Sequence, residues 1–364
     1  MEYDLRKIGA GWNIYGNYVN GERWGSGHIN DTFSVTYNQG GTCVRYIFQR
    51  INHSIFTDPP ALMENIRRVT EHQHARLDGE PDSSRRALTV VPHRDGASFL
   101  KDDSGNYWRC YLFVENASTY DKIQTTQQAY EAARAFGEFQ NILSDLPGDP
   151  LTETIPDFHN TPKRYSALKK AIESDSANRA VSARPEIDFA LECEKFASVL
   201  LKEQEAGVLP LRTTHNDTKL NNVMLDDETG KGICVIDLDT VMPGLTLYDF
   251  GDLVRTSVSP AAEDERDLSM VAVRMDMFEA LVRGYLETAG GFLSEAERSY
   301  LAFSGKLITL EIGVRFLTDY LESDVYFKVH RQGHNLDRCR AQFALVKAII
   351  DREEDMSRTV RNGA

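Results

Sequence analysis

The chain has 364 residues, of which 41% are hydrophobic and 26% charged, a composition typical of a globular protein too long for one compact core. Its 41 basic and 55 acidic side chains give a net charge of -14, which repels phosphate backbones and anionic lipids and argues against nucleic acid or a membrane as partner. No stretch approaches the roughly 20 apolar residues that cross a bilayer, no secretory signal is visible and the five scattered cysteines form no CxxC pair, so we expect a soluble, cytoplasmic protein.

The first third of the chain has the pattern of strands. Three short segments rich in aromatic and β-branched residues and separated by glycine-containing turns are predicted as strands: 20–24, 32–37 and 44–50. One helix and two more strands are expected at 58–74, 87–92 and 107–114. This order predicts a small lobe of sheet and helix, residues 1–115, that ends near Glu115.

After Glu115 the hydrophobic pattern changes to a period of 3.6. Helices are predicted at 126–143, 186–205, 265–288, 295–321 and 337–356. The segment 145–162 contains four prolines and is read as a loop, and residues 212–239 form an island of strand pattern. The chain is therefore predicted to be an α+β protein with a β-rich N-lobe and a mainly helical C-lobe, residues 116–364, that contains a hairpin.

The strongest motif lies in that island. His215-Asn216-Asp217 is followed five residues later by Asn222, and after a turn an apolar strand ends at Asp237. Phosphoryl transfer requires a carboxylate that accepts the hydroxyl proton and oxygen ligands for Mg²⁺. Each of these residues alone is ordinary in a turn, but their conjunction is rare. We predict Asp217 as the catalytic base and Asn222 and Asp237 as the metal ligands.

On these residues the chain resembles the aminoglycoside phosphotransferase and choline kinase superfamily, whose members carry an H-x-D-x-x-x-x-N loop and an aspartate at the end of an apolar strand. Within it, the chain is similar to the N-acetylhexosamine 1-kinases in the segments 27–30, 214–222, 236–240, 248–252, 315–317 and 319–321. The resemblance covers nearly the whole chain. It implies a bilobal protein-kinase-like fold, ATP and Mg²⁺ as cofactors, and phosphorylation of the anomeric hydroxyl of GlcNAc or GalNAc in sugar salvage.

Two regions are candidates for nucleotide binding. The turn Gly25-Ser26-Gly27 lies between two predicted strands and can place backbone N–H groups over phosphates, although it lacks the third glycine of a kinase loop and could be a plain hairpin turn. Glu115 falls at the predicted junction of the lobes, where adenine meets the backbone in this fold. We therefore predict these four residues as the nucleotide-binding ones.

One position departs from the kinase pattern. The strand 44–50 carries Gln49 where kinases have their phosphate-binding lysine. Strand alternation places Arg45 on the same face as Gln49, so Arg45 is the expected substitute. The missing lysine also leaves open a regulatory pseudokinase, but the intact Asp217, Asn222 and Asp237 argue against one.

The acceptor side is predicted mainly from the resemblance. It implies sugar contacts for His28, Arg315 and Tyr326, and Asp217 meets the acceptor hydroxyl as the base. Asp239, two residues after Asp237 in a predicted strand, points to the same side and could contact the metal or the sugar. Arg315 lies in an apolar helical stretch and needs a partner, which could be a structural one such as Glu311 or Asp319. The resemblance also implies that Asp249 braces the catalytic loop. A kinase for an aminoglycoside, choline or homoserine remains the alternative, and no pattern indicates a protein partner.

Overall fold

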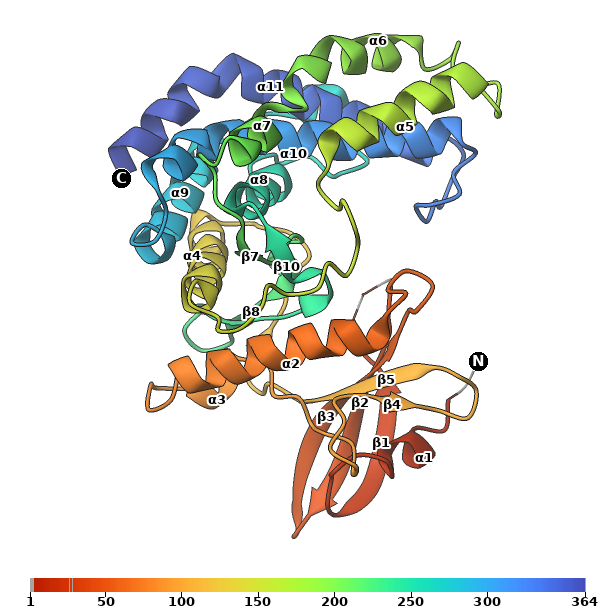
Figure 1. Cartoon of the computed structure of the whole chain (residues 1–364), viewed down its shortest axis with the longest axis vertical. Coiled ribbons are helices and arrows are strands. Elements are labelled where there is room, and N and C mark those ends of the chain that lie inside the picture. Colours follow the sequence, from red (N-terminus) through yellow and green to blue (C-terminus); the bar gives the residue numbers. More distant parts are fainter. Residues whose placement is uncertain (1–2, 26, 28, 364) are drawn as a thin grey trace. The chain divides into compact units, whose positions relative to one another are not determined.

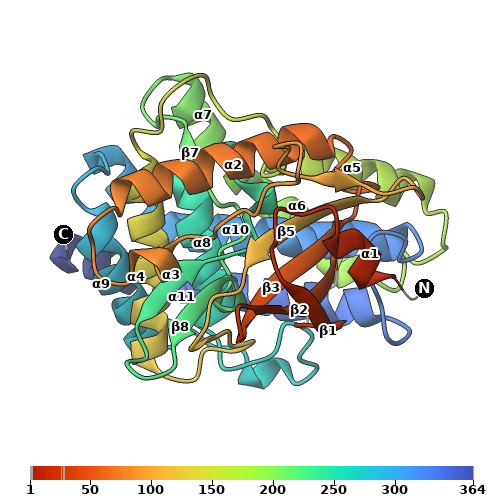
Figure 2. The same cartoon turned by 90° about the horizontal axis from the view of Figure 1, so that it is seen from below.

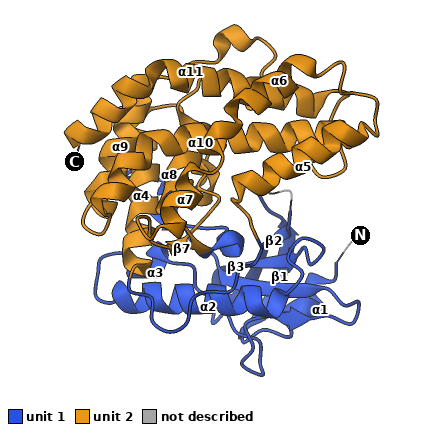
Figure 3. Ribbon diagram, turned by 45° about the horizontal axis from the view of Figure 1, so that its top comes forward, with its two compact units in different colours: residues 1–118, 145–156, 224–242 blue, residues 119–144, 157–223, 243–364 orange. Residues whose placement is uncertain are grey.

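The computed structural model describes residues 3–25, 27 and 29–363. The chain forms two compact units (Figure 3). Unit 1 comprises residues 1–118, 145–156 and 224–242, and unit 2 comprises residues 119–144, 157–223 and 243–364. All five cysteines are free thiols. Among the described residues, no helix has the length and apolar character needed to cross a membrane.

Unit 1 is built on an antiparallel sheet of five strands in the order β1-β2-β3-β5-β4 (Figure 1). The strands are β1 (Asn17–Arg23), β2 (Asp31–Gln39), β3 (Thr42–Ile51), β4 (Leu100–Lys101) and β5 (Tyr107–Leu112). The strands predicted at 20–24, 32–37, 44–50 and 107–114 are thus confirmed. The segment 87–92 forms only a bridge between Val90 and Tyr111, because Pro92 has no N–H with which to continue the pairing.

The two faces of this sheet differ in character. Trp108 and Cys110 of β5 and Phe48 of β3 are fully buried in an apolar cluster with the short helix α1 (Leu5–Gly9). Because side chains alternate along a strand, the neighbouring residues Gln49 and Arg109 lie on the opposite face. The helix α2 (Pro59–Arg76) begins where predicted, with the Asp58 side chain accepting a hydrogen bond from the backbone, and runs beside the sheet (Figures 1 and 2); a one-turn helix, α3 (Ser83–Arg86), follows it.

A second, smaller sheet in unit 1 contains the predicted hairpin. It consists of β6 (Ala117–Ser118), β8 (Val223–Asp226) and β9 (Gly232–Val235), in the order β6-β8-β9. The chain leaves β9 through Asp237, which has a left-handed backbone with φ of 60° and precedes a short 3-10 turn, Leu238–Thr240. The hairpin therefore delivers Asp237 at a sharp change of backbone direction.

Unit 2 is mainly helical. Its helices are α4 (Thr126–Leu143), α5 (Thr161–Ser174), α6 (Arg184–Cys193), α7 (Val199–Glu205), α8 (Thr246–Ser257), α9 (Met275–Ala289), α10 (Glu295–Leu321) and α11 (His334–Gly363). Two short strands, β7 (Arg212–Thr214) and β10 (Met242–Gly244), pair with each other. Both α4 and α10 have the predicted bounds, and each begins with a capping box that satisfies its first backbone N–H groups.

The buried helix α10 organises the core of unit 2 and packs against α8 and α11 (Figure 1). Gly251 of α8 faces Ser304 of α10 so closely that a Cβ at position 251 would lie 2.5 Å from the Ser304 carbonyl oxygen. The two helix backbones approach this closely only because position 251 has no side chain. This crossing fixes α8, which carries Asp249 and Asp252.

Candidate active site

The catalytic loop follows β7 in unit 2 and is held by the carboxylate of Asp249. The Asp249 carboxylate accepts hydrogen bonds from the backbone N–H groups of His215, at 2.9 Å, and Asn216, at 2.6 Å. The Thr218 hydroxyl donates to the Asp249 carbonyl at 2.5 Å, and Gln140 donates to its carboxylate. The prediction that Asp249 braces this loop is confirmed.

The residue before the predicted base has an unusual backbone. Asn216 has φ of 65°, a left-handed conformation that costs free energy outside glycine and persists only when its surroundings enforce it. The enforcing contacts are the Asp249 carboxylate and the His159 ring, whose Nε2 lies 3.3 Å from the Asn216 carbonyl oxygen. The buried ring of His215 packs edge-on against Phe136. The loop thus presents Asp217 from a rigid support.

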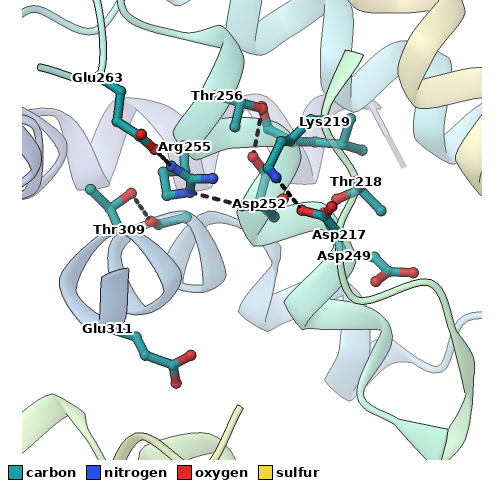
Figure 4. A network of polar contacts seen from close by, with 12 residues as sticks. Asp217, Thr218, Lys219, Asp249, Asp252, Arg255, Thr256, Glu263, Thr309 and Glu311 are labelled. Carbon is teal, nitrogen blue, oxygen red and sulfur yellow. Dashed lines mark hydrogen bonds and ion pairs between the residues drawn. The ribbon is translucent and has the colours of Figure 1, made fainter. Parts of the chain in front are cut away.

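The Asp217 carboxylate contacts the ammonium group of Lys219 (Figure 4) and the side-chain amide of Asn222. Its Oδ1 lies 2.7 Å from Lys219 Nζ, and its Oδ2 accepts a hydrogen bond of 3.1 Å from Asn222 Nδ2. Burial raises the pKa of Asp217, but the charges of Lys219, His215 and Arg255 outweigh it and hold the pKa below its usual value. Asp217 is therefore ionised at neutral pH and able to accept a proton.

Next to Asp217 and Lys219 lies a cluster of charged side chains that includes Asp252 and Arg255 of α8. Arg255 is buried and donates to Asp252 at 2.7 Å and to Glu263 at 2.9 Å (Figure 4). Asp217 raises the pKa of Lys219, and Asp252 raises it further despite burial. Sequence reasoning did not select Lys219, although the spacing Asp-x-Lys in the catalytic loop was a usable signal.

The predicted metal ligands are oxygen donors, as Mg²⁺ prefers. The Asn222 side chain is buried and its Nδ2 donates to both the carbonyl and the carboxylate of Asp217, so the amide oxygen is the atom available to a metal. Asp237, in unit 1, is exposed at its left-handed turn. No group of three or more His, Cys, Asp or Glu in the described part of the chain could hold a metal, and Mg²⁺ is usually held by one or two carboxylates with substrate phosphates.

Asp239, predicted to contact the sugar, lies in a buried polar cluster of unit 1. Its Oδ1 forms an ion pair with Arg109 and its Oδ2 accepts a hydrogen bond of 2.6 Å from Asn30. The carboxylate is about 4% exposed, so both of its oxygens are already engaged inside the protein. A sugar contact by Asp239 stays a prediction, and the observed partners give it a structural role as well.

The predicted nucleotide residues lie in unit 1. Gly25 has φ of 74°, and among the described residues no atom comes within 4 Å of a Cβ built at Gly25 or Gly27. Ser26 and His28 lie outside the described residues. Glu115 forms an ion pair with Arg45. The roles of Gly25, Ser26, Gly27, His28 and Glu115 stay predictions.

Arg45, the expected substitute for the missing lysine, has a different environment. Its guanidinium pairs with Glu115 and lies 3.7 Å from the ring centroid of Phe113 and 5.8 Å from that of Trp24. The residue whose charge reaches Gln49 is Arg109, on the neighbouring strand, which donates to the Gln49 side chain at 2.9 Å. Sequence reasoning missed Arg109, because only the register of β3 and β5 pairs the two positions.

Two of the predicted sugar contacts, Arg315 and Tyr326, meet in one pocket of unit 2. The pocket has a volume of about 190 Å³ and lies between α5 and the C-terminal end of α10. Its wall includes Arg164, Arg315, Thr318, Asp319, Glu322 and Tyr326. Asp319 accepts hydrogen bonds from the backbone N–H groups of Tyr326, at 2.7 Å, and Phe327, at 2.9 Å, and so fixes this turn onto α10.

Arg315 contacts aromatic rings and not the acidic partner that was expected for it. Its guanidinium lies between 5.5 and 5.8 Å from three ring centroids, those of Phe158, Tyr326 and Phe327. Within the described part of the chain, neither Glu311 nor Asp319 forms an ion pair with it, because Glu311 pairs with His159 and Asp319 binds backbone N–H groups. The pocket therefore contains a guanidinium that pairs with no carboxylate among the residues that the structure describes.

A second arginine lies beside it. Arg164 donates to the Phe158 carbonyl at 2.7 Å, and its buried Nε has no hydrogen-bond partner among the described residues. Burial lowers the pKa of Arg164, and the nearby charge of Arg315 lowers it further. The two positive charges are thus close enough to repel each other in the free protein.

Comparison with known proteins identifies the family. The family model described as the phosphotransferase enzyme family matches residues 20–291, which is more than half of the chain. The chain therefore belongs to the phosphotransferase enzyme family. This agrees with the phosphotransferase chemistry that the H-x-D-x-x-x-x-N loop predicted.

Solved structures share its fold at low sequence identity. An aminoglycoside phosphotransferase from Alicyclobacillus acidocaldarius is 11% identical with a TM-score of 0.61, and the match covers 100% of this chain and 98% of the other. A spectinomycin phosphotransferase, solved with ADP and spectinomycin, is 11% identical with a TM-score of 0.55 over 96% of this chain and 97% of that one. A choline kinase from Cryptosporidium parvum is 15% identical with a TM-score of 0.54, covering 94% and 92%. The predicted kinase-like fold is confirmed.

Proposed function

We propose that this phosphotransferase is a cytoplasmic kinase that transfers the γ-phosphoryl group of ATP, with Mg²⁺, to the anomeric hydroxyl of an N-acetylhexosamine. The observation that supports this proposal most is that Arg315 and Tyr326 line one pocket. The resemblance to hexosamine kinases had implied sugar contacts for both residues before the pocket was known. The products are the α-1-phosphate and ADP. GlcNAc and GalNAc are the proposed acceptors.

The chemistry follows from the state of Asp217. Its ionised carboxylate accepts the proton of the acceptor hydroxyl while that oxygen forms a bond to phosphorus and the bond to ADP breaks. The anomeric hydroxyl is more acidic than an ordinary alcohol, so one carboxylate suffices. Lys219 is within 2.7 Å of the base and offsets negative charge at the reacting groups. Mg²⁺, held by Asn222 and Asp237, would neutralise charge on the phosphates.

The pocket contains two arginines and two acidic residues, so its formal charges balance. Arg164 and Arg315 offer N–H donors to hydroxyl and acetamide oxygens and repel ammonium groups. Asp319 also lines the pocket, but its oxygens accept from backbone N–H groups and from Asn335. Glu322 is exposed. This balance supports a neutral sugar over the cationic acceptors named for the solved relatives, such as choline.

A kinase for another small hydroxyl compound, such as homoserine or an aminoglycoside, is the second candidate. It is supported by the family alone, and the two arginines argue against its strongly cationic members. A regulatory pseudokinase is less well supported, because Asp217 retains both its ionised state and its partners Lys219 and Asn222.

Product analysis tests the proposal. The chain is incubated with Mg²⁺-ATP and GlcNAc or GalNAc, and phosphorus and proton NMR locate the phosphate. The proposal requires coupling of phosphorus to the anomeric proton. Arg315→Met and Tyr326→Phe should raise the KM for the sugar and leave that for ATP. Coupling to the C6 protons, or no product with either sugar, would overturn the assignment.

A further inference from the structure

A buried arginine in unit 1 lies beside Gln49, the position at which kinases carry their phosphate-binding lysine. Arg109 is the middle of β5, is about 1% exposed, and is cross-strand paired with Gln49 of β3. Its side chain forms an ion pair with Asp239 and stands 5.4 Å from the ring centroid of Tyr111. A buried cation is retained only where charge and hydrogen bonds compensate its loss of water, which Asp239 and Gln49 provide here.

The neutral residue at position 49 is matched to this cation. Gln49 Oε1 accepts from Arg109 Nε at 2.9 Å, while Gln49 Nε2 donates to the Thr32 hydroxyl at 2.9 Å. A lysine at position 49 would direct a second positive charge at Arg109 on the same face of the sheet. The charge that kinases carry on this strand has thus been moved one strand across, to β5.

The arginine connects the sheet to the turn that carries Asp237. Asp239 belongs to the 3-10 turn that follows Asp237 directly, and its carboxylate is fixed by Arg109 and by Asn30 at 2.6 Å. Its carbonyl accepts a hydrogen bond of 2.8 Å from the Thr154 hydroxyl. With both its side chain and its backbone held, Asp239 anchors the turn two residues beyond the left-handed Asp237.

We propose that Arg109 is a positioning residue that takes the place of the kinase lysine: by holding Asp239 it fixes the direction of the Asp237 carboxylate. This inference rests on the proposed role of Asp237 as a Mg²⁺ ligand. Ligands of a metal are normally oriented by neighbouring residues that do not bind the metal themselves. Arg109 contacts Asp239 directly, its charge also acts on the Asp237 carboxylate, and its side chain is about 1% exposed. It is therefore not expected to touch the phosphates itself.

The test measures nucleotide binding rather than activity. Calorimetry gives the affinity of the full chain for ADP with and without Mg²⁺. The ratio of the two affinities is the gain in ADP affinity that the metal produces, called the gain below. In Arg109→Gln the metal-free affinity should stay near wild type, while the gain should fall by a factor of roughly 10 to 100. The control Arg50→Gln breaks the ion pair between Arg50 and Asp31, next to Gln49 on β3, and should keep the gain.

A second variant, in which the positive charge is moved from β5 to β3, tests the inference if Arg109→Gln fails to fold. In the double variant Gln49→Lys/Arg109→Gln the cation returns to β3 and can again pair with Asp239, so the gain should be largely restored. An unchanged gain in Arg109→Gln, an equal loss in Arg50→Gln, or a folded double variant without the gain would each overturn the inference. A wild-type chain without any gain would instead remove the proposed metal site, and this inference with it.

Discussion

The carboxylate of Asp217 shows how single residues define this site. Its partners, Lys219 at 2.7 Å and Asn222 at 3.1 Å, keep it ionised and oriented, and the buried Asp249 fixes the backbone on which it stands. None of these contacts is unusual alone. Together they give a proton acceptor that is held in position before any substrate binds.

Replacing the base tests its role. Asp217→Asn keeps the size of the side chain and removes proton acceptance, so kcat should fall by a factor of about 10² to 10⁴ while ADP binding persists. The control Asp227→Asn lies in the exposed turn of the hairpin and should leave kcat unaltered. Steady-state kinetics of both variants decide the point, and turnover of Asp217→Asn within a few-fold of wild type would remove it from the mechanism.

The predicted role of Asp237 as a Mg²⁺ ligand can be tested by removing its carboxylate. Removing its carboxylate in Asp237→Ala should abolish the increase in ATP affinity that Mg²⁺ produces, because a hard oxygen ligand is lost. Calorimetric titration with ATP, with Mg²⁺ and with EDTA, measures this directly. An equal Mg²⁺ effect in the variant and the wild type would show that the metal site lies elsewhere.

The residues that the sequence predicted differ in kind from those that only the structure indicates. Asp217, Asn222 and Asp237 were predicted because their spacing along the chain reports their chemistry. Lys219 was overlooked within the same motif, although its spacing was visible. Arg109 could not be found in this way, because its pairing with Gln49 depends on which residues of two strands, 60 positions apart in the sequence, lie opposite each other.

At the scale of elements, the crossing of α8 and α10 supports the site. Gly251 of α8 allows the close approach to Ser304, and Asp249, two residues earlier, braces the catalytic loop. Gly251→Ala should lower the free energy of unfolding by about 1 to 3 kcal/mol, because a methyl group there overlaps the Ser304 carbonyl.

Urea unfolding followed by circular dichroism measures that loss. The matched control is Gly291→Ala, since no described atom lies within 4 Å of a Cβ at position 291 and its φ is not positive. Its effect on the free energy of unfolding should stay below about 1 kcal/mol. Equal effects of the two substitutions would contradict the close crossing.

A buried contact between a carboxylate and an imidazole links α10 to the segment before α5. Glu311 lies 2.9 Å from His159 Nδ1 and accepts a hydrogen bond of 2.6 Å from the Thr161 hydroxyl. Burial raises the pKa of Glu311, but His159 and Thr161 outweigh it, so the pKa is lowered on folding. The resulting stabilisation is present above the unfolded pKa of about 4.3 and is lost as pH falls through the lower folded value.

This sign predicts a pH-dependent variant. Glu311→Gln should be less stable than wild type by on the order of 2 kcal/mol at neutral pH, and the difference should shrink below about pH 4 as the wild-type carboxylate is protonated. Urea unfolding of both proteins across this pH range is the measurement. A difference that does not change with pH would show that the charge of Glu311 contributes nothing.

The predicted helices differ from the observed ones at three places in unit 2. The helix α5 begins at Thr161 within the proline-rich segment, because Pro162 at its start occupies a position that needs no N–H donor. The helix α8 was not among the predicted helices; nearly all its residues are buried, and its regularity comes from packing on α10. The helix expected at 186–205 is split by the 3-10 turn Glu194–Phe196.

The whole molecule combines a net negative charge with a pocket that contains two arginines. The net charge of -14 argued against polyanionic partners, yet Arg164 and Arg315 lie beside Asp319 and Glu322 in one pocket of unit 2. Composition predicted the two-part architecture and the class of partner, because both are averages over many residues. The acceptor depends on a few side chains from α5, α10 and the turn after it, and averages contain no information on these.

Acceptor selectivity is the central claim at this scale. The direct measurement is ADP release from Mg²⁺-ATP by the full chain with six acceptors in turn: GlcNAc, GalNAc, galactose, kanamycin, choline and homoserine. The predicted result is turnover with GlcNAc, GalNAc or both, well above that with the other four, because Arg164 and Arg315 of the proposed acceptor pocket offer N–H donors to hydroxyl and acetamide oxygens. Turnover with kanamycin, choline or homoserine, and none with either N-acetylhexosamine, would contradict it.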